Sequence, residues 1–188
     1  MADEKLQRRV QGYPGVRMDG MTDLLLRAHG AAVMDVGCNR GHVGFEFYWS
    51  GARLVHGCDN YKPGIEFARE MFIDYRNVES QFEVVDLTQG PSSLAPFRGQ
   101  RYDIMLCLAT IHKLRRVMAP GALSELIRHL GNRTGSFFGW RATSEKFDEN
   151  EDEMALLDGE LLAVGLQRTH TSYISRNLGV AAIWERRP

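Results

Sequence analysis

The sequence is short of the features that mark several common classes of protein. It has only three cysteines, Cys38, Cys58 and Cys107, which are far apart and never form a Cys-x-x-Cys pair. That spacing argues against a disulfide framework or a zinc site, and we expect buried thiols and no bound metal. No apolar run approaches the roughly 18 residues that cross a bilayer, and the charged start MADEKLQRRV lacks the apolar segment of a secretory signal. We therefore expect a cytoplasmic protein with no membrane partner.

Neither sign of charge is in excess. The 188 residues include 23 Lys and Arg against 24 Asp and Glu, for a net charge of −1. A generic nucleic-acid coat shows a clear basic excess, so this balance argues against one, although a local basic patch stays possible. The hydrophobic share of 44% is ordinary for globular proteins, and the length suits one domain.

Short apolar runs alternate with helical stretches along the chain. Strands are predicted at residues 31–37, 53–59, 81–87, 102–110, 135–142, 166–174 and 180–187, and helices at 21–29, 43–50, 63–76, 121–130 and 151–164. This alternation is typical of a doubly wound α/β fold, and a turn at 177–179 makes the last two strands a hairpin. We expect a mixed seven-stranded sheet in residues 31–188, preceded by an N-terminal arm with a short helix at 1–30.

The loop after the first predicted strand, DVGCNRGHVG at 35–44, is a candidate binding element. Gly37 and Gly41 allow a sharp turn and close approach of a ligand before a helix N-terminus, and Asn39 tolerates positive φ. Their spacing is not the Gly-x-Gly-x-x-Gly of a dinucleotide site. A carboxylate at Asp35 would repel a pyrophosphate but attract a cation or an amino group.

Two more carboxylates come at the ends of the next strands. Asp59 ends the second strand, where a carboxylate can accept hydrogen bonds from ribose hydroxyls. Asp86 ends the third, where it can accept from an exocyclic amine such as that of adenine. One carboxylate each for an amino acid, a ribose and an adenine fits an adenosyl amino acid better than a dinucleotide.

The succession DVGCNRGHVG, HGCDN, VVDL and YDIMLCLATIH resembles the motif order of class I S-adenosylmethionine-dependent methyltransferases, with their Rossmann-like seven-stranded fold. The resemblance runs from residue 31 to the C-terminus, and Asn39 stands where many members have glycine. It implies an enzyme that uses S-adenosyl-L-methionine and releases S-adenosyl-L-homocysteine. The cofactor-binding residues that it implies are Asp35, Gly37, Cys38, Asn39, Gly41, His42, Asp59, Asn60, Asp86, Leu87 and Leu108.

The residues around the methyl acceptor are less defined. His112, just beyond the fourth strand, is a candidate general base because imidazole titrates near neutral pH, or else a helix-start residue on the rim. Lys113 either steers an anionic substrate or is a solvated lysine. Trp140 and Arg141 end the fifth strand and form either a substrate wall or, for the tryptophan, part of the core.

The N-terminal arm is a possible lid, with Tyr13 and Arg17 facing the substrate, or has no fixed place. We expect methyl transfer to oxygen or nitrogen of an unidentified acceptor, with a small molecule favoured over RNA or protein. By the resemblance, the absence of Asn/Asp-Pro-Pro-Tyr/Phe and of Pro-Cys after the fourth strand disfavours adenine-amine and cytosine-C5 methylation. An RNA methyltransferase, a nicotinamide oxidoreductase and a catalytically silent cofactor-binding module stay open, as does the oligomeric state.

Overall fold

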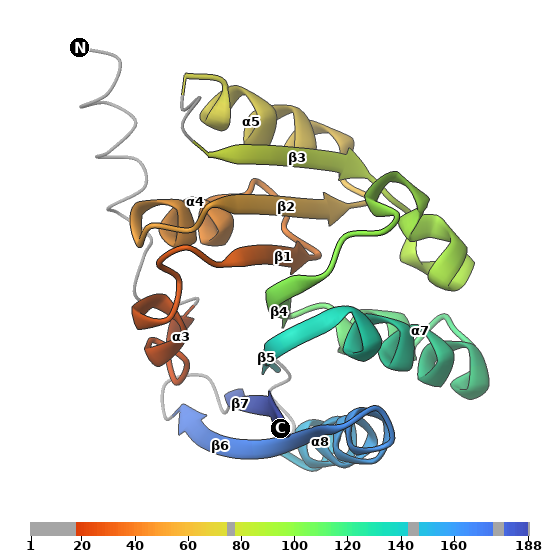
Figure 1. Ribbon diagram of the computed structural model, residues 1–188. Coiled ribbons are helices and arrows are strands. Elements are labelled where there is room, and N and C mark those ends of the chain that lie inside the picture. Colours follow the sequence, from red (N-terminus) through yellow and green to blue (C-terminus); the bar gives the residue numbers. More distant parts are fainter. Residues whose placement is uncertain (1–17, 75–77, 143–146, 175–178, 188) are drawn as a thin grey trace.

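The computed structural model describes residues 18–74, 78–142, 147–174 and 179–187 (Figure 1). Tyr13 and Arg17 lie outside these ranges, as do residues 177 and 178 of the expected turn. The elements in chain order are α3 (Asp23–Leu26), β1 (Ala32–Val36), α4 (His42–Trp49), β2 (Leu54–Asp59), α5 (Lys62–Phe72), β3 (Glu79–Val84), η1 (Leu87–Phe97), β4 (Tyr102–Leu108), α6 (Ile111–Arg115), α7 (Pro120–Arg133), β5 (Thr134–Arg141), α8 (Phe147–Leu162), β6 (Leu166–Ile174) and β7 (Gly179–Arg186).

These strands form one seven-stranded sheet in the order β3-β2-β1-β4-β5-β7-β6. β7 is antiparallel to both of its neighbours, and the pairings among β1 to β5 are parallel. The expected α/β fold with a mixed sheet and a C-terminal hairpin is confirmed. The strand order reverses between β1 and β4, and in such sheets ligands bind outside the carboxyl ends of the strands at that point.

Helices cover both faces of the sheet (Figure 1). α3, α4 and α5 pack on one face, with buried residues that include Phe45 and Ile65. η1, α7 and α8 pack on the other face, with buried residues that include Leu126 and Leu157. Each such side chain stabilises the fold by roughly 1.5–3 kcal/mol through burial, so the sheet is a rigid support for the loops at its edge. Within the described ranges, no helix has the length and apolarity needed to cross a bilayer.

The third strand ends earlier than the sequence predicts, at Val84 instead of residue 87. The reason is the turn at Asp86, whose carboxylate accepts from the Thr88 amide at 3.0 Å and from the Thr88 hydroxyl at 2.7 Å. These hydrogen bonds start η1, two short 3₁₀ segments joined at Gly90, which the sequence pattern did not predict. Asp86 therefore lies in a loop that faces the carboxyl edge of the sheet.

The fourth strand is also shorter than predicted, because Ala109 has a φ of 55° and turns the chain after Leu108. The five-residue helix α6 follows, with His112 in its first turn, which agrees with the helix-start interpretation of this residue. Its extent was not predicted, because one turn leaves no periodic pattern. The helix predicted at 21–29 is likewise reduced to the single turn of α3.

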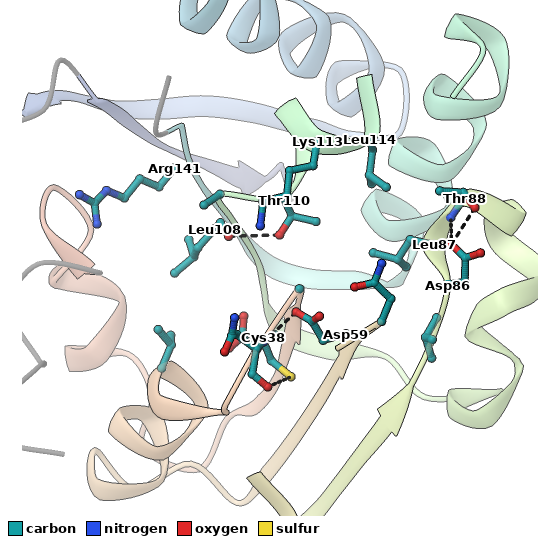
Figure 2. Close-up of a pocket in the computed structure, with 17 residues that line it drawn as sticks. Cys38, Asp59, Asp86, Leu87, Thr88, Leu108, Thr110, Lys113, Leu114 and Arg141 are labelled. Atoms are coloured by element: carbon teal, nitrogen blue, oxygen red, sulfur yellow. Dashed lines mark hydrogen bonds between the residues drawn. The ribbon is translucent and has the colours of Figure 1, made fainter. Parts of the chain in front are cut away.

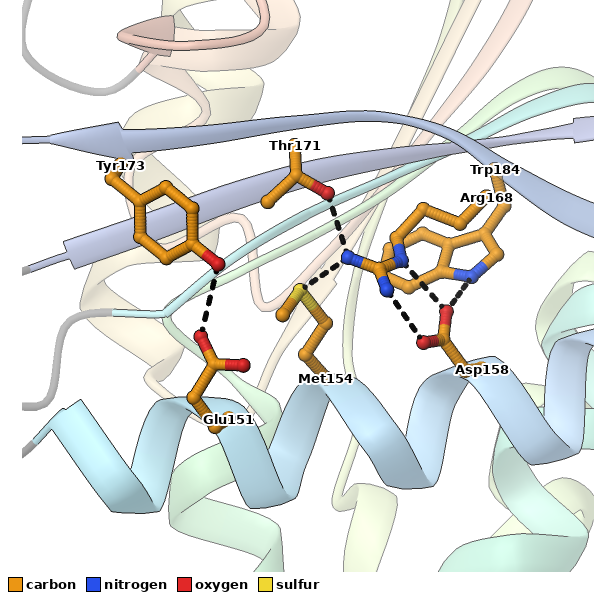
Figure 3. Close-up of polar contacts among 7 residues, drawn as sticks. All are labelled: Glu151, Met154, Asp158, Arg168, Thr171, Tyr173 and Trp184. Carbon is orange, nitrogen blue, oxygen red and sulfur yellow. Dashed lines mark hydrogen bonds and ion pairs between the residues drawn. The ribbon is translucent and has the colours of Figure 1, made fainter.

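A polar cluster fixes the C-terminal hairpin to α8 (Figure 3). The Arg168 guanidinium donates to Asp158 at 2.9 Å and to the Thr171 hydroxyl at 2.7 Å, and it also contacts the Met154 sulfur at 3.0 Å. The Trp184 indole donates to the same Asp158 carboxylate at 2.9 Å. One carboxylate thus links β6 and β7 to the helix that covers them.

Candidate active site

A cavity of about 340 Å³ opens at the carboxyl edge of the sheet, beside the point where the strand order reverses (Figure 2). The predicted residues that line it are Asp35, Gly37, Cys38, Asn39, Asp59, Asn60, Asp86, Leu87, Leu108, Lys113 and Arg141. The other lining residues are Val43, Val85, Thr88, Ala109, Thr110 and Leu114. The structure therefore gathers residues from five consecutive strand ends around one hollow.

Thr110 closes the wall of the cavity behind Gly37. Its hydroxyl lies 3.1 Å from the Val36 carbonyl and 3.1 Å from the Leu108 carbonyl, so it links the ends of β1 and β4. Gly37 has a φ of 83°, and a Cβ atom there would lie 2.0 Å from the Thr110 Oγ1. Glycine is needed both for the backbone conformation and for this close approach.

Asp59 is oriented by two loops at once. Its Oδ2 accepts from the Asn39 amide at 2.9 Å, and its Oδ1 accepts from the Tyr61 amide at 2.9 Å. Asn39 has a φ of 51°, a left-handed conformation that asparagine tolerates better than most residues. Since each carboxylate oxygen has two acceptor sites, both oxygens can still accept from a pair of ligand hydroxyls.

Asp86 lies at one end of the group drawn in Figure 2, beside Leu87 and Thr88. Hydrogen bonds from the Thr88 hydroxyl and amide hold the pKa of the Asp86 carboxyl below its usual value. It is therefore a charged acceptor at neutral pH, suited to an amine donor. The Val85 amide donates to the Asp59 carbonyl at 3.0 Å, which holds this loop beside the end of β2.

The three cysteines are buried thiols. Burial raises the pKa of Cys58 to about 12, and it raises the pKa of Cys38 and of Cys107 well above the usual value. All three are neutral near pH 7 and are poor nucleophiles, although Cys38 lines the cavity.

His112 and Lys113 lie side by side on α6, but only Lys113 lines the cavity. His112 is half-buried, and its Nδ1 has no hydrogen-bond partner among the residues that the structure describes. Burial lowers the pKa of His112, and the charges of Lys113 and Arg116 lower it further against the opposing effect of Glu149. The imidazole is therefore neutral at physiological pH.

Three more predicted residues do not reach the cavity. Trp140 is fully buried, and its indole donates to Glu153 at 2.6 Å, so it belongs to the core and forms no substrate wall. Its neighbour Arg141 points to the opposite side of β5 and lines the cavity.

Gly41 is the left-handed residue before α4, and His42 packs edge-on against Phe67 with ring centroids 5.7 Å apart. Gly41 and His42 do not line the cavity, and they stabilise the turn between β1 and α4 from outside it.

Glu153 makes the stability of the fold depend on pH. Burial raises its pKa from 4.5 to about 7, against the opposing effects of the Trp140 hydrogen bond and of Arg115. Between these two values the folded state binds more protons than the unfolded state does. The free energy of unfolding therefore falls as the pH rises through this window, because the charged form must be buried.

We expect Glu153→Gln to remove this pH dependence. Glutamine keeps an acceptor oxygen for the Trp140 indole and has no charge to bury. At about pH 8 the variant should be more stable than the wild type by about 2–3 kcal/mol, and at about pH 4 the two should be equal. Urea unfolding at both pH values measures the difference, and equal stability at pH 8 would contradict the assignment.

The methyltransferase domain family matches residues 33–133, which is more than half of the chain. The chain therefore belongs to this family, and the expected assignment to the class I S-adenosylmethionine-dependent methyltransferases is confirmed. No curated protein sequence matches the chain.

Solved structures of methyltransferases share the fold. Magnesium protoporphyrin IX methyltransferase from Synechocystis PCC 6803 with bound SAM is 19% identical, with a TM-score of 0.67 over 98% of this chain and 91% of that one. The N-methyltransferase NodS from Bradyrhizobium japonicum WM9 is 10% identical, with a TM-score of 0.65 over the whole of both chains. The 16S rRNA methylase RmtB is 17% identical, with a TM-score of 0.66 over 91% of this chain and 62% of that one. At these identities the similarity concerns the fold alone.

Proposed function

We propose that this cavity binds S-adenosylmethionine and that the protein transfers its methyl group to oxygen or nitrogen of a small acceptor. The observation that carries the proposal is the order of three carboxylates along one cavity. Asp35, Asp59 and Asp86 come from the ends of β1 and β2 and from the loop after β3. They would meet, in turn, the amino group, the ribose hydroxyls and the adenine amine of one extended ligand.

The residues around this row fit the same ligand. Asn60 and Leu87 would flank the adenine, with Leu108 on the opposite side, and all three line the cavity. Gly37 and Asn39 place backbone close to the hollow, as the approach of a methionine chain requires. The Synechocystis relative was solved with SAM, which supports this choice of cofactor.

When bound, the cofactor supplies a methyl group already activated by a sulfonium. The protein then has to align an acceptor and, for a hydroxyl or a protonated amine, accept its proton. His112 does not line the cavity, but it lies beside Lys113, which does, and its imidazole is neutral, so it stays our candidate base. Tyr13 and Arg17 stay proposed as substrate-side residues of a lid, and a cytoplasmic location stays a prediction.

Titration calorimetry with S-adenosylhomocysteine and with NADH tests the cofactor assignment. Micromolar binding of S-adenosylhomocysteine alone would support the proposal. Binding of NADH in its place would favour the oxidoreductase alternative. Binding of neither would contradict the proposed enzyme and leave a degenerate site as the explanation.

A further inference from the structure

A second cavity, of about 290 Å³, lies at the opposite edge of the sheet from the candidate active site. It is bounded by the second half of η1, by the loop that leads into β4, and by the last turns of α7, which lead into β5. β4 and β5 are parallel, and they begin beside this cavity and end beside the other one. A ligand bound here would therefore lie apart from the cofactor.

The ionisable side chains of this second cavity are all basic. Arg98 and Arg101 line it from the loop before β4, and His129 and Arg133 line it from α7. Of the described residues that line it, none is an aspartate or a glutamate. In the candidate active site carboxylates offset the cations, whereas here the three arginines leave an excess of positive charge.

The guanidiniums of Arg98 and Arg101 are available to a ligand. Both residues are exposed, and neither guanidinium forms a hydrogen bond or an ion pair with any residue that the structure describes. The charge of Arg101 is felt by a neighbouring arginine. Burial lowers the pKa of Arg186, and the positive charge of Arg101 lowers it further.

Arg133 is held in place at the wall of the same cavity. Its Nε donates to the Gln100 carbonyl at 3.0 Å, and its Nη2 donates to the Phe97 carbonyl. Its guanidinium carbon lies 5.5 Å from the centre of the Tyr102 ring. Because both acceptors are neutral carbonyls, these bonds orient the guanidinium without cancelling its charge, and its remaining N–H groups can donate to a ligand.

His129 contributes no charge near neutral pH. Burial lowers its pKa, and Arg133 lowers it further, against the opposing effect of Glu125. The neutral ring can still donate or accept a hydrogen bond. Leu94 and Ala95 add an apolar part to the wall, so the cavity can also contact an organic group attached to an anion.

The available positive charge does not extend far beyond this cavity. Arg128, which precedes His129 on α7, pairs with Glu160. Asp103, one residue into β4, lies 3.7 Å from the guanidinium of Arg53. A long polyanion such as RNA is bound by many cations that follow its backbone. The confined charge therefore favours a small anion.

We propose that this second cavity binds a small phosphate, either free or as a monoester of a small molecule, between Arg98, Arg101 and Arg133. A phosphate monoester carries about −1.5 to −2 charges at pH 7, and guanidiniums match its oxygens with paired hydrogen bonds. A carboxylate has one charge and two oxygens, so three guanidiniums suit it less well. The inference is independent of the proposed function, since the two cavities share no lining residue.

An NMR titration of the full chain tests this proposal. The probes are inorganic phosphate, phenyl phosphate and the neutral control phenol, at matched ionic strength. We expect both phosphates to shift the amide signals of residues 97–101 and 129–133, and phenol to leave them in place. Tighter binding of phenyl phosphate would identify a phosphate monoester as the ligand, and tighter binding of inorganic phosphate would identify the free ion. Equal shifts with phenol, or no shifts with either phosphate, would overturn the proposal. Shifts with a single-stranded RNA alone would overturn it too, in favour of nucleic acid.

Two double variants separate direct contact from general charge. Arg98→Gln with Arg101→Gln removes two guanidiniums that have no partner among the described residues, so urea unfolding should show unchanged stability. We expect this variant to weaken binding of the preferred phosphate at least about tenfold. Arg40→Gln with Arg116→Gln removes the same charge from exposed positions outside the cavity, and it should change binding less than twofold. Equal effects of the two double variants would refute a phosphate bound in this cavity.

Discussion

Asp59→Ala should weaken binding of S-adenosylhomocysteine by about a hundredfold, because hydrogen bonds to a charged group contribute about 1.5–3 kcal/mol and a ribose offers two hydroxyls. The carboxylate is held by the amides of Asn39 and Tyr61, at 2.9 Å each, before any ligand arrives. Such preorganisation means that little binding energy is spent on orienting it. Titration calorimetry of the wild type and the variant measures the loss.

Two further variants show what the loss means. Asp59→Asn keeps one acceptor oxygen and should fall between the wild type and Asp59→Ala. Glu70→Gln removes a carboxylate from the exposed surface of α5, outside the cavity, and should bind like the wild type. Tight binding by Asp59→Ala would show that the ribose does not bind at Asp59. The order of the three carboxylates would then no longer support the proposed binding of S-adenosylmethionine in this cavity.

The sequence was sufficient to find the cofactor side of the site because its residues stand at strand ends. Asp35 is the last but one residue of β1 and Asp59 is the last residue of β2, and the carboxyl ends of neighbouring parallel strands meet at one edge of the sheet. The third strand was predicted to end three residues too late, but Asp86 still lies at the predicted edge of the sheet. The reason is that the loop after β3 turns back toward that edge.

The acceptor side was harder to predict, because it depends on which of two successive residues in a strand points toward the cavity. In β5 (Thr134–Arg141) the residues toward the end are buried on both faces, so alternation of polar and apolar residues does not reveal which side chain faces the cavity. Trp140 was as good a candidate as Arg141 for that reason. Thr110 escaped notice because its role depends on a contact with Gly37 from a different strand.

The contact between Gly37 and Thr110 leads to the second large effect. Gly37→Ala should lower the free energy of unfolding by about 3 kcal/mol, of which roughly 1–2 kcal/mol is the cost of a left-handed conformation for alanine. The rest comes from a Cβ placed 2.0 Å from the Thr110 Oγ1 and 3.0 Å from its Cγ2. Rotating the threonine does not relieve the overlap, because both branches of its side chain are too close and its hydroxyl would leave the Val36 and Leu108 carbonyls.

Gly30→Ala is the matched control, since Gly30 has a φ of 72° but no atom within 4 Å of the place that a Cβ would take. It carries the backbone cost alone, so we expect it to lose about 1–2 kcal/mol in the same urea unfolding experiment. Thr110→Ala removes the hydroxyl and the methyl group, and in the Gly37→Ala background it should restore more than about 1 kcal/mol, a coupling that a double-mutant cycle detects. If Gly37→Ala costs no more than Gly30→Ala, then Thr110 does not close over the loop. The link between β1 and β4 that shapes the wall of the cavity would then have to be sought in other residues.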